Sequence, residues 1–433
     1  MAARLCCVRH QALLYWIVRL ENMIRLPQIL TILIAVQSVL AQTGRVQTGI
    51  EVLRDRHFDI LRGKRVGLIT NPTGVDSKLN STIDILHGAD GVRLVALFAP
   101  EHGVRGDRLA GEVVGSYIDK ATNLPVYSLY GKIRKPTPAM LKNVDILVYD
   151  IQDIGCRSYT YISTMGSAME SAAENNLEFV VLDRPNPLGG ERVEGNIVES
   201  GYSSFISPYP IPYVYGLTCG ELATMLNDEG LLKNGTHCKL TVVPMKNWKR
   251  NMMFEDTEHP WVPTSPHIPT ATTAMYCVAT GILGELGVVS EGVGYTIPFQ
   301  ALAAPWIDPD RLADSLNGLR VNGIRFRPVT FRPFYGRWKD STLQGVQLYI
   351  TDAARLNLMS VQFLFMQVVK ELYPGRNLFS MADTSALRRF DRILGTGEIR
   401  RRLTKTMRYE DVRDYLEKDV PGFRKRSERY WLY

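Results

Sequence analysis

The sequence predicts an α/β fold built on a mainly parallel sheet, and three observations support this prediction. Short apolar runs at 65–69, 93–98, 146–149 and 179–182 have the length and composition of buried strands. Segments at 81–86, 137–142 and 160–175 lie between these runs and have helical patterns. Each apolar run also ends in a cluster of polar residues. This alternation is typical of a three-layer fold with right-handed crossovers.

A further helix and strand extend this region to about residue 245. Thr218 and Glu221 have the spacing of a capping box for a helix over 218–230, and 240–244 has the pattern of a strand. The connection that follows is rich in Trp and Pro, which is typical of a loop that lines a site or a domain seam. We therefore expect one α/β domain over 42–265 and a smaller α+β domain over 266–433.

The N-terminus has the pattern of a secretory signal peptide. Met23-Ile24-Arg25 supplies a short positive region, 29–36 is apolar, and Val39-Leu40-Ala41 fits a cleavage site. Residues 1–22 precede a second methionine, so Met23 is an alternative start, and an uncleaved N-terminal helix is the other interpretation of the segment. We expect a periplasmic or secreted protein with no stable membrane span after removal of the leader, because no later run approaches about 18 apolar residues.

The net charge and the spacing of the cysteines limit the partners and the kinds of site that we expect for this chain. Residues 1–41 contain four Arg and one Glu, so their removal lowers the net charge from +7 to +4. The remaining excess lies near the C-terminus and is interleaved with acidic residues, which indicates a solvated helical face. Attraction to an acidic cell-wall polymer is the second interpretation, and we expect no nucleic-acid partner. The four later cysteines fit no zinc or redox spacing. A Cys219–Cys238 disulfide and buried free thiols are both compatible with the sequence.

Polar clusters after four predicted strands indicate an active site, because the carboxyl ends of parallel strands face one crevice. Glu101 and His102 follow the second strand, and a partly desolvated Glu there would suit a general acid. A solvent-facing loop Glu is the alternative. Asp150 and Asp153 follow the third strand and are candidates for a base or for orienting Glu101, or else they cap a helix or pair with Arg157.

Two arginines and several neutral polar residues favour an anionic carbohydrate as the ligand. Arg157 and Arg184 could bind a carboxylate in a fork geometry, or could neutralise nearby aspartates. Hydroxyl and amide groups of the kind that bind sugar hydroxyls are supplied by Asn71, Tyr159, Tyr161 and Asn186.

We expect no cofactor and no metal at this site. The chain lacks GxGxxG after the first strand, GxxxxGK[ST] and GxSxG, which excludes the usual dinucleotide, P-loop and nucleophile-elbow sites. A magnesium or manganese site built from Asp150, Asp153, Glu101 and His102 is a weaker alternative to a metal-free pair of carboxylates.

Nine segments of the chain match motifs of a known family. They are 68–74 (LITNPTG), 98–106 (FAPEHGVRG), 110–112 (AGE), 124–131 (LPVYSLYG), 150–155 (DIQDIG), 159–161 (YTY), 182–187 (LDRPNP), 193–195 (VEG) and 216–218 (GLT). With these segments the chain resembles the NamZ-type exo-β-N-acetylmuramidases, a glycoside hydrolase family of peptidoglycan recycling. The resemblance covers nearly the whole of the chain after the leader.

The resemblance implies a Rossmann-like domain, a smaller C-terminal domain that closes the cleft, and release of N-acetylmuramic acid from the non-reducing end of peptidoglycan fragments. It implies that Glu101 is the essential carboxylate. We expect Glu101 to protonate the leaving oxygen and Asp150 or Asp153 to assist water or the acetamido group, since glycosidases use two carboxyl groups. Arg157 or Arg184 would bind the lactyl carboxylate. Further substrate-binding residues are expected at Glu194, His267 and Glu291.

Two functions from other classes are also compatible with the residues. One is a non-catalytic periplasmic protein that binds muropeptides or sugars in the same crevice. The other is a metal-dependent phosphoesterase. The expected partners of the hydrolase are peptidoglycan-derived saccharides that contain N-acetylmuramic acid, and no nucleic acid.

Overall fold

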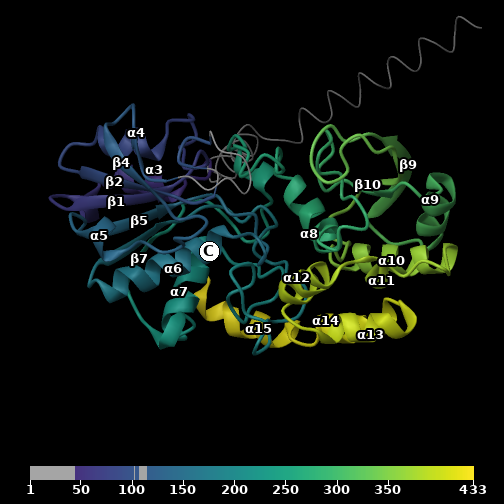
Figure 1. The fold of residues 1–433 in the computed structure, drawn as a ribbon. Helices are drawn as coiled ribbons and strands as arrows, with labels where there is room; N and C mark the ends of the chain where they lie inside the picture. The colour runs from purple at the N-terminus through teal and green to yellow at the C-terminus, as the bar shows by residue number, and fades with distance from the viewer. Residues whose placement is uncertain (1–43, 102, 107–114) are drawn as a thin grey trace, which may run out of the picture. The chain divides into compact units, whose positions relative to one another are not determined.

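A seven-stranded sheet forms the first part of the fold in the computed structural model, which describes residues 44–101, 103–106 and 115–433 (Figure 1). Residues 46–433 form one compact unit. The strand order is β3-β4-β2-β1-β5-β6-β7, and every pairing is parallel except that of β3 with β4. The predicted α/β class with a mainly parallel sheet is therefore confirmed. The strands are β1 Arg65–Thr70, β2 Arg93–Ala99, β3 Tyr117–Asp119, β4 Leu124–Ser128, β5 Ile146–Asp150, β6 Glu178–Leu182 and β7 Lys239–Val243.

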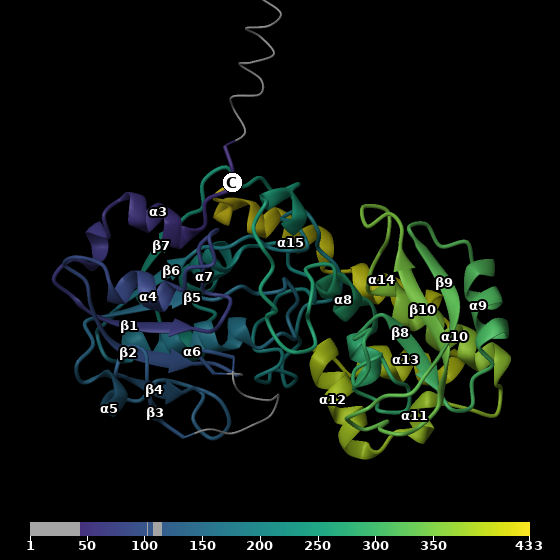
Figure 2. The same ribbon diagram turned by 90° about the horizontal axis from the view of Figure 1, so that it is seen from above.

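Helices cover both faces of this sheet because its strands bury side chains on both sides. On β5, Ile146 and Val148 pack with α3 and α4, whereas Leu147 and Tyr149 pack with α5, α6 and α7. Figure 1 shows α3 and α4 above the sheet and α5 and α6 below it, and Figure 2, seen from above, shows the strands side by side. These helices are α3 Gly49–Asp55, α4 Thr82–His87, α5 Pro138–Leu141, α6 Tyr161–Glu174 and α7 Cys219–Asp228.

The predicted capping box of α7 is confirmed. The Thr218 hydroxyl accepts from the backbone N–H of Glu221 at 3.2 Å, and the Glu221 carboxylate accepts from the backbone N–H of Thr218 at 3.0 Å. Strands β3 and β4 were not predicted. They are short, β4 contains Pro125, and most of its side chains are only half-buried, so neither has the apolar signal of a central strand.

A second, antiparallel sheet with the order β8-β10-β9 lies in the C-terminal part, which has the predicted α+β character. Its strands are β8 Ala301–Ala304, β9 Ile324–Phe331 and β10 Leu343–Ile350. The helices are α8 Thr273–Gly284, α9 Pro309–Gly318, α10 Ser360–Leu372, α11 Leu378–Met381, α12 Thr384–Leu394, α13 Glu398–Thr406, α14 Glu410–Glu417 and α15 Val420–Ser427.

The last residues of the chain return to the first sheet. Phe423 of α15 packs in the core beneath α6 and α7, and the Tyr433 hydroxyl donates to Asp183 at 2.6 Å. The domain limits proposed from the sequence, 42–265 and 266–433, stay a prediction. The C-terminal segment contributes to both parts of the fold.

Arg157 braces the two parts from a fully buried position. Its guanidinium donates to the carbonyls of Asn196 at 2.7 Å and Ile211 at 2.6 Å, and also to the carbonyl of Ile393 in α12 at 2.9 Å. Burial lowers the pKa of Arg157 to about 10, which still leaves the group charged at neutral pH.

Candidate functional site

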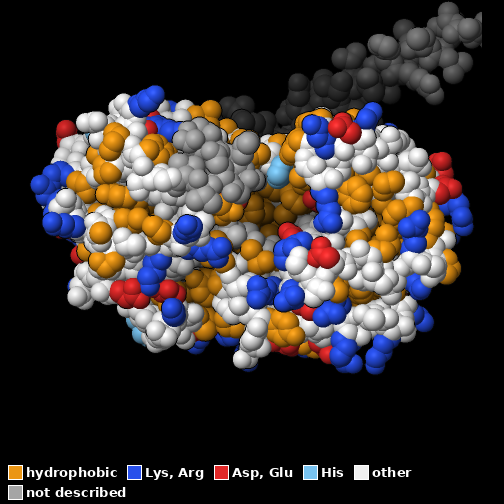
Figure 3. All heavy atoms as spheres, in the orientation of Figure 1, with side chains coloured by type: hydrophobic (Ala, Val, Ile, Leu, Met, Phe, Trp, Pro, Cys, Tyr) orange, Lys and Arg blue, Asp and Glu red, His pale blue; other side chains and the backbone are white. Residues whose placement is uncertain are grey.

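A cavity of about 290 Å³ lies between the ends of the parallel strands and helix α8. Glu101, which lies two residues after the end of β2, lines it together with Tyr159 and Tyr161, which follow β5. His267 and Glu285 line it from the C-terminal side. Figure 3 shows a hollow with hydrophobic side chains in it on one face of the molecule. The remaining lining residues are Ser158, Thr160, Ile206, Tyr213, Ser265, Ile268, Cys277, Gly281, Phe299 and Ile393.

Four residues singled out in the sequence therefore meet here, namely Glu101, Tyr159, Tyr161 and His267. The strand-end geometry explains the first three, because the loops after β2 and β5 open at the same edge of the sheet. His267 comes from the Pro-rich connection that was expected to line a site or a seam.

Two tyrosines, Tyr130 and Tyr161, lie near the carboxylate of Glu101. Burial and the adjacent charge of Glu101 raise the pKa of Tyr130 to about 12, and the Tyr130 hydroxyl is hydrogen-bonded to that carboxylate. Burial, and then the charge of Glu101, also raise the pKa of Tyr161. Both phenols therefore keep their protons at neutral pH. A carboxyl group in this setting has a hydrogen-bond donor that fixes its orientation.

The tyrosine wall is itself held in place. The Tyr159 and Tyr161 rings meet edge to face with centroids 4.9 Å apart. The Tyr159 hydroxyl donates to the Thr264 hydroxyl at 2.8 Å, and the Tyr161 hydroxyl donates to the Thr264 carbonyl. These contacts tie the first turn of α6 to the connection that carries His267, so the cavity wall is preorganised.

Two carboxyl groups lie next to α8, and of the two only Glu285 lines the cavity. Glu285 lines the cavity and forms an ion pair with Arg389 at 3.3 Å. Glu291 packs against Gly284 so closely that a Cβ at Gly284 would lie 2.5 Å from its carboxylate oxygen. Burial raises the pKa of Glu291 to about 7. Glu291 makes no hydrogen bond to another residue in the described part of the chain, so its carboxyl group is not committed to a structural partner.

The fold brings Asp150 and Arg184 together, but it does not bring them to the cavity that contains Glu101. The guanidinium donates to both carboxylate oxygens, at 2.5 and 2.9 Å, and also to the Val75 carbonyl at 2.9 Å. Asp150 accepts a further hydrogen bond from the Thr82 hydroxyl. Both side chains are buried, and neither lines the cavity that contains Glu101. The pair fastens the ends of β5 and β6 to the loop after β1.

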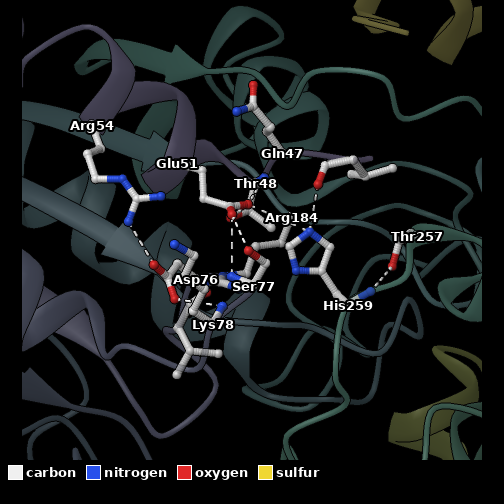
Figure 4. A network of polar contacts seen from close by, with 12 residues as sticks. Gln47, Thr48, Glu51, Arg54, Asp76, Ser77, Lys78, Arg184, Thr257 and His259 are labelled. Carbon is white, nitrogen blue, oxygen red and sulfur yellow. Dashed lines mark hydrogen bonds and ion pairs between the residues drawn. The ribbon is translucent and has the colours of Figure 1, made fainter. Parts of the chain in front are cut away.

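Arg184 instead faces a second polar network (Figure 4). It lines a cavity of about 20 Å³ together with Thr48, Gln152 and His259. Glu51 accepts from the Thr48 backbone N–H at 2.9 Å and from the Ser77 hydroxyl at 2.6 Å, and it lies 3.7 Å from His259. This space is about the size of one water molecule, which is too small for a sugar.

Asp153 and the two asparagines make local contacts that shape loops. Asp153 accepts from the Gly155 backbone N–H at 2.7 Å and from the Tyr215 hydroxyl at 2.5 Å, and burial raises its pKa to about 6. Asn71 accepts from the backbone and hydroxyl of Thr73, and Asn186 donates to the Leu217 carbonyl at 2.9 Å. None of the three lines the cavity that contains Glu101.

The other predicted site residues lie elsewhere. The guanidinium of Arg157 donates its hydrogen bonds to backbone carbonyls, as described above. Glu194 pairs with Arg192 and accepts from the Met359 backbone N–H at 3.0 Å, and it lines a separate cavity of about 530 Å³. His102 lies outside the described residues, as do residues 1–43, which hold the proposed leader, and the Ala110-Gly111-Glu112 motif.

A metal-binding cluster, a membrane-spanning helix and a disulfide are all absent from residues 44–101, 103–106 and 115–433. Within these ranges no three His, Cys, Asp or Glu side chains are grouped closely enough to hold a metal ion. No helix in the same ranges has the length and hydrophobicity needed to cross a membrane. Cys156, Cys219, Cys238 and Cys277 are buried free thiols, so the alternative of a Cys219–Cys238 disulfide is wrong for this structure.

Sequence reasoning missed Tyr130, Tyr213 and Glu285. Tyr130 follows β4, a strand that was not predicted, although it lies in one of the matched motifs. Tyr213 lies in 191–216, a Pro- and Tyr-rich segment that forms no helix and no regular strand. Glu285 follows α8, whose position relative to Glu101 depends on the packing of the two parts of the fold.

Comparisons with known proteins agree with this architecture. The profile of the N-terminal domain of the exo-β-N-acetylmuramidase NamZ family matches residues 66–272, and that of the C-terminal domain matches 275–433. The peptidoglycan β-N-acetylmuramidase NamZ of Bacillus subtilis (strain 168) is 46% identical over 393 residues, which cover 91% of this chain and 92% of that protein.

Two crystal structures of DUF1343 family proteins from Bacteroides fragilis NCTC 9343 have the same fold. One has a TM-score of 0.86 and 58% identity, and the other has a TM-score of 0.70 and 28% identity. Each match covers 90% of this chain and 99% of the solved chain. The two domain profiles and the close curated relative together show that this chain belongs to the exo-β-N-acetylmuramidase NamZ family of glycoside hydrolases.

Proposed function

We propose that this chain is an exo-acting glycoside hydrolase that releases N-acetylmuramic acid from the non-reducing end of peptidoglycan fragments, as part of cell-wall turnover. Family membership supports the reaction, because both domain profiles together span nearly all of residues 66–433. The observation that carries the proposal is the position of Glu101 just after the end of β2, in a cavity walled by tyrosines and within hydrogen-bonding reach of Tyr130.

Glu101 is the proposed general acid. Glycosidic cleavage needs a carboxylic acid to protonate the leaving oxygen and a second group on the other side of the sugar ring. Glu101 is the carboxyl group from the parallel sheet that lines the cavity. Tyr130 remains protonated and orients it.

The second group is proposed to come from the C-terminal part. Asp150 is already held by Arg184 and Thr82, and Asp153 by Tyr215 and Gly155, so these aspartates have structural roles in our proposal. Glu285 has its charge compensated by Arg389. Glu291 does not itself line the cavity, but it packs against Gly284 of α8, one residue before the cavity-lining Glu285. It makes no hydrogen bond to another residue in the described part of the chain, so we propose that it assists the attacking water or the acetamido group.

The roles that we propose for Arg157 and Arg184 differ from those expected from the sequence. Neither Arg157 nor Arg184 lines the cavity, and both have donors directed at backbone carbonyls or at Asp150. We therefore propose no contact between either arginine and the lactyl carboxylate. His267 lies at the cavity and remains a proposed substrate-binding residue.

The proposed location follows from the substrate and from the leader. Peptidoglycan lies outside the cytoplasm, and the pattern of residues 1–41 is that of a secretory signal. We propose a periplasmic or secreted enzyme that acts on saccharides containing N-acetylmuramic acid.

The test is incubation of the purified protein with the disaccharide in which N-acetylmuramic acid is β-linked to N-acetylglucosamine. Mass spectrometry should show free N-acetylmuramic acid and N-acetylglucosamine in equal amounts, with activity retained after treatment with a chelator. A receptor would bind the disaccharide without cleaving it, and loss of activity with the chelator would favour metal-dependent chemistry.

The pH dependence of kcat tests the role of Glu291. A group with a pKa of about 7 is mostly protonated below pH 7 and ionised above it, so a carboxylate that assists attack becomes competent as the pH rises. We expect kcat to rise through an ascending limb near pH 7, and Glu291→Gln to lower kcat by about 100-fold and to remove that limb. Glu285→Gln, as the matched control, should keep the limb. An unchanged limb in Glu291→Gln would refute the assignment.

A further inference from the structure

The loop between β9 and β10 carries two exposed aromatic side chains. The exposed fractions are 57% for Phe334 and 41% for Tyr335. We call these two residues the aromatic ledge. Large aromatic side chains are usually buried, and a group of them at the surface commonly marks a binding site.

Backbone contacts hold the loop between β9 and β10 against the segment that contains Gly294. The Phe334 backbone N–H donates to the Gly294 carbonyl at 2.9 Å, and the Asp340 backbone N–H donates to the Pro333 carbonyl at 3.0 Å. Gly294 has a φ of +94°, and a Cβ there would lie 2.3 Å from the Tyr335 carbonyl oxygen. Only glycine permits this approach, so the loop is docked in a defined position.

The rings of the ledge are held by other rings. Phe334 lies 5.4 Å from Tyr335 and 6.1 Å from Tyr295, measured between ring centroids, and Tyr295 in turn contacts Phe331 of β9 at 5.1 Å. These ring contacts order the two side chains in the free protein, so little further side-chain entropy is lost when a ligand binds.

The ledge is continuous with the cavity. The Tyr335 ring stacks on the His267 ring with centroids 5.9 Å apart and an angle of 16° between the planes. His267 lines the same cavity as Glu101. Tyr335 is thus one ring away from the cavity lining, and Phe334 extends the apolar surface further out.

We propose that the aromatic ledge is the subsite for the sugar on the leaving-group side of the scissile bond. This inference rests on the proposed function. An exo-acting enzyme encloses the terminal N-acetylmuramic acid, so the next sugar must lie at the cavity mouth. Aromatic faces suit the apolar C–H faces of a sugar ring, and the ledge offers two uncharged faces next to that mouth. The occupant is the N-acetylglucosamine that follows the terminal residue in peptidoglycan fragments.

The experiment compares two substrates that differ only in the leaving group. One is the β-linked disaccharide of N-acetylmuramic acid and N-acetylglucosamine, and the other is methyl β-N-acetylmuraminide, which has no second ring. For the double variant Phe334→Ala/Tyr335→Ala we expect kcat/KM on the disaccharide to fall about tenfold, mainly through KM. On the methyl glycoside kcat/KM should stay within about twofold of wild type.

Two further variants separate the ledge from general effects on folding. Tyr335→Phe keeps the stacking face and should retain wild-type kcat/KM on both substrates. Tyr349→Ala removes a tyrosine of similar exposure, 42%, from β10 and should change neither value. Equal losses on both substrates, or no loss on the disaccharide, would overturn the proposal. A wild-type protein that cleaves neither substrate would instead refute the proposed function itself.

Discussion

Glu101→Gln is expected to lower kcat on the disaccharide by about 1,000-fold or more while the substrate still binds. Gln has nearly the same shape as Glu and can still accept the hydrogen bond from Tyr130. It has no acidic proton, so it cannot protonate the leaving oxygen, and general-acid catalysis is worth about 10²–10⁴-fold. Stopped assays for free N-acetylmuramic acid would give kcat, and calorimetry would give the affinity of the inactive variant.

The pattern of the losses distinguishes catalysis from a change in folding. Glu101 is only partly buried, and the variant should unfold within about 1 kcal/mol of wild type in urea. Tyr130→Phe is the milder companion change, because it removes the orienting hydroxyl and leaves the acid in place. Full activity of Glu101→Gln would show that the acid is another residue.

Asp150→Ala is expected to lower the free energy of unfolding by about 3–5 kcal/mol. The substitution leaves the buried guanidinium of Arg184 without its carboxylate, and removing one partner of a buried ion pair typically costs that much. It also removes the acceptor for the Thr82 hydroxyl, which joins the start of α4 to the end of β5. Urea unfolding followed by circular dichroism measures the difference.

Asp145→Ala is the matched control, because Asp145 also pairs with an arginine, Arg65, across the end of the sheet. Both side chains of that pair are more than a third exposed, so the loss should be below about 1 kcal/mol. Asp150→Asn, assayed where the protein remains folded, should keep kcat within about threefold. Similar losses of stability at the two sites, or abolished turnover in a folded Asp150→Asn, would contradict the structural role of Asp150.

The strand and helix pattern of the first part could be predicted because each element carries a local signal. Strands β1, β2, β5 and β6 are short apolar runs, and α7 begins with a complete capping box. Glu101 could be placed near the site because it lies just after a strand end. Strands β3 and β4 and the return of α15 to the first sheet have weak signals or depend on distant contacts.

The roles of Asp150, Arg157 and Arg184 could not be predicted, for one physical reason. A charged residue after a buried strand either faces the crevice or braces the loops behind it, and its three-dimensional partner decides which. Arg184 lies 34 positions from Asp150 in the chain, and Arg157 lies 236 positions from the Ile393 carbonyl that it binds. The sequence shows the charges but not these pairings.

The central claim is that the cavity lined by Glu101 holds the muramic acid residue at the bond to be cleaved. A crystal structure of Glu101→Gln with the uncleaved disaccharide tests it most directly. We predict the N-acetylmuramic acid ring inside the cavity, the glycosidic oxygen within hydrogen-bonding distance of residue 101, and the second sugar against Phe334 and Tyr335. A disaccharide bound instead in the arginine-rich cavity around Arg192 and Arg250 would contradict the account.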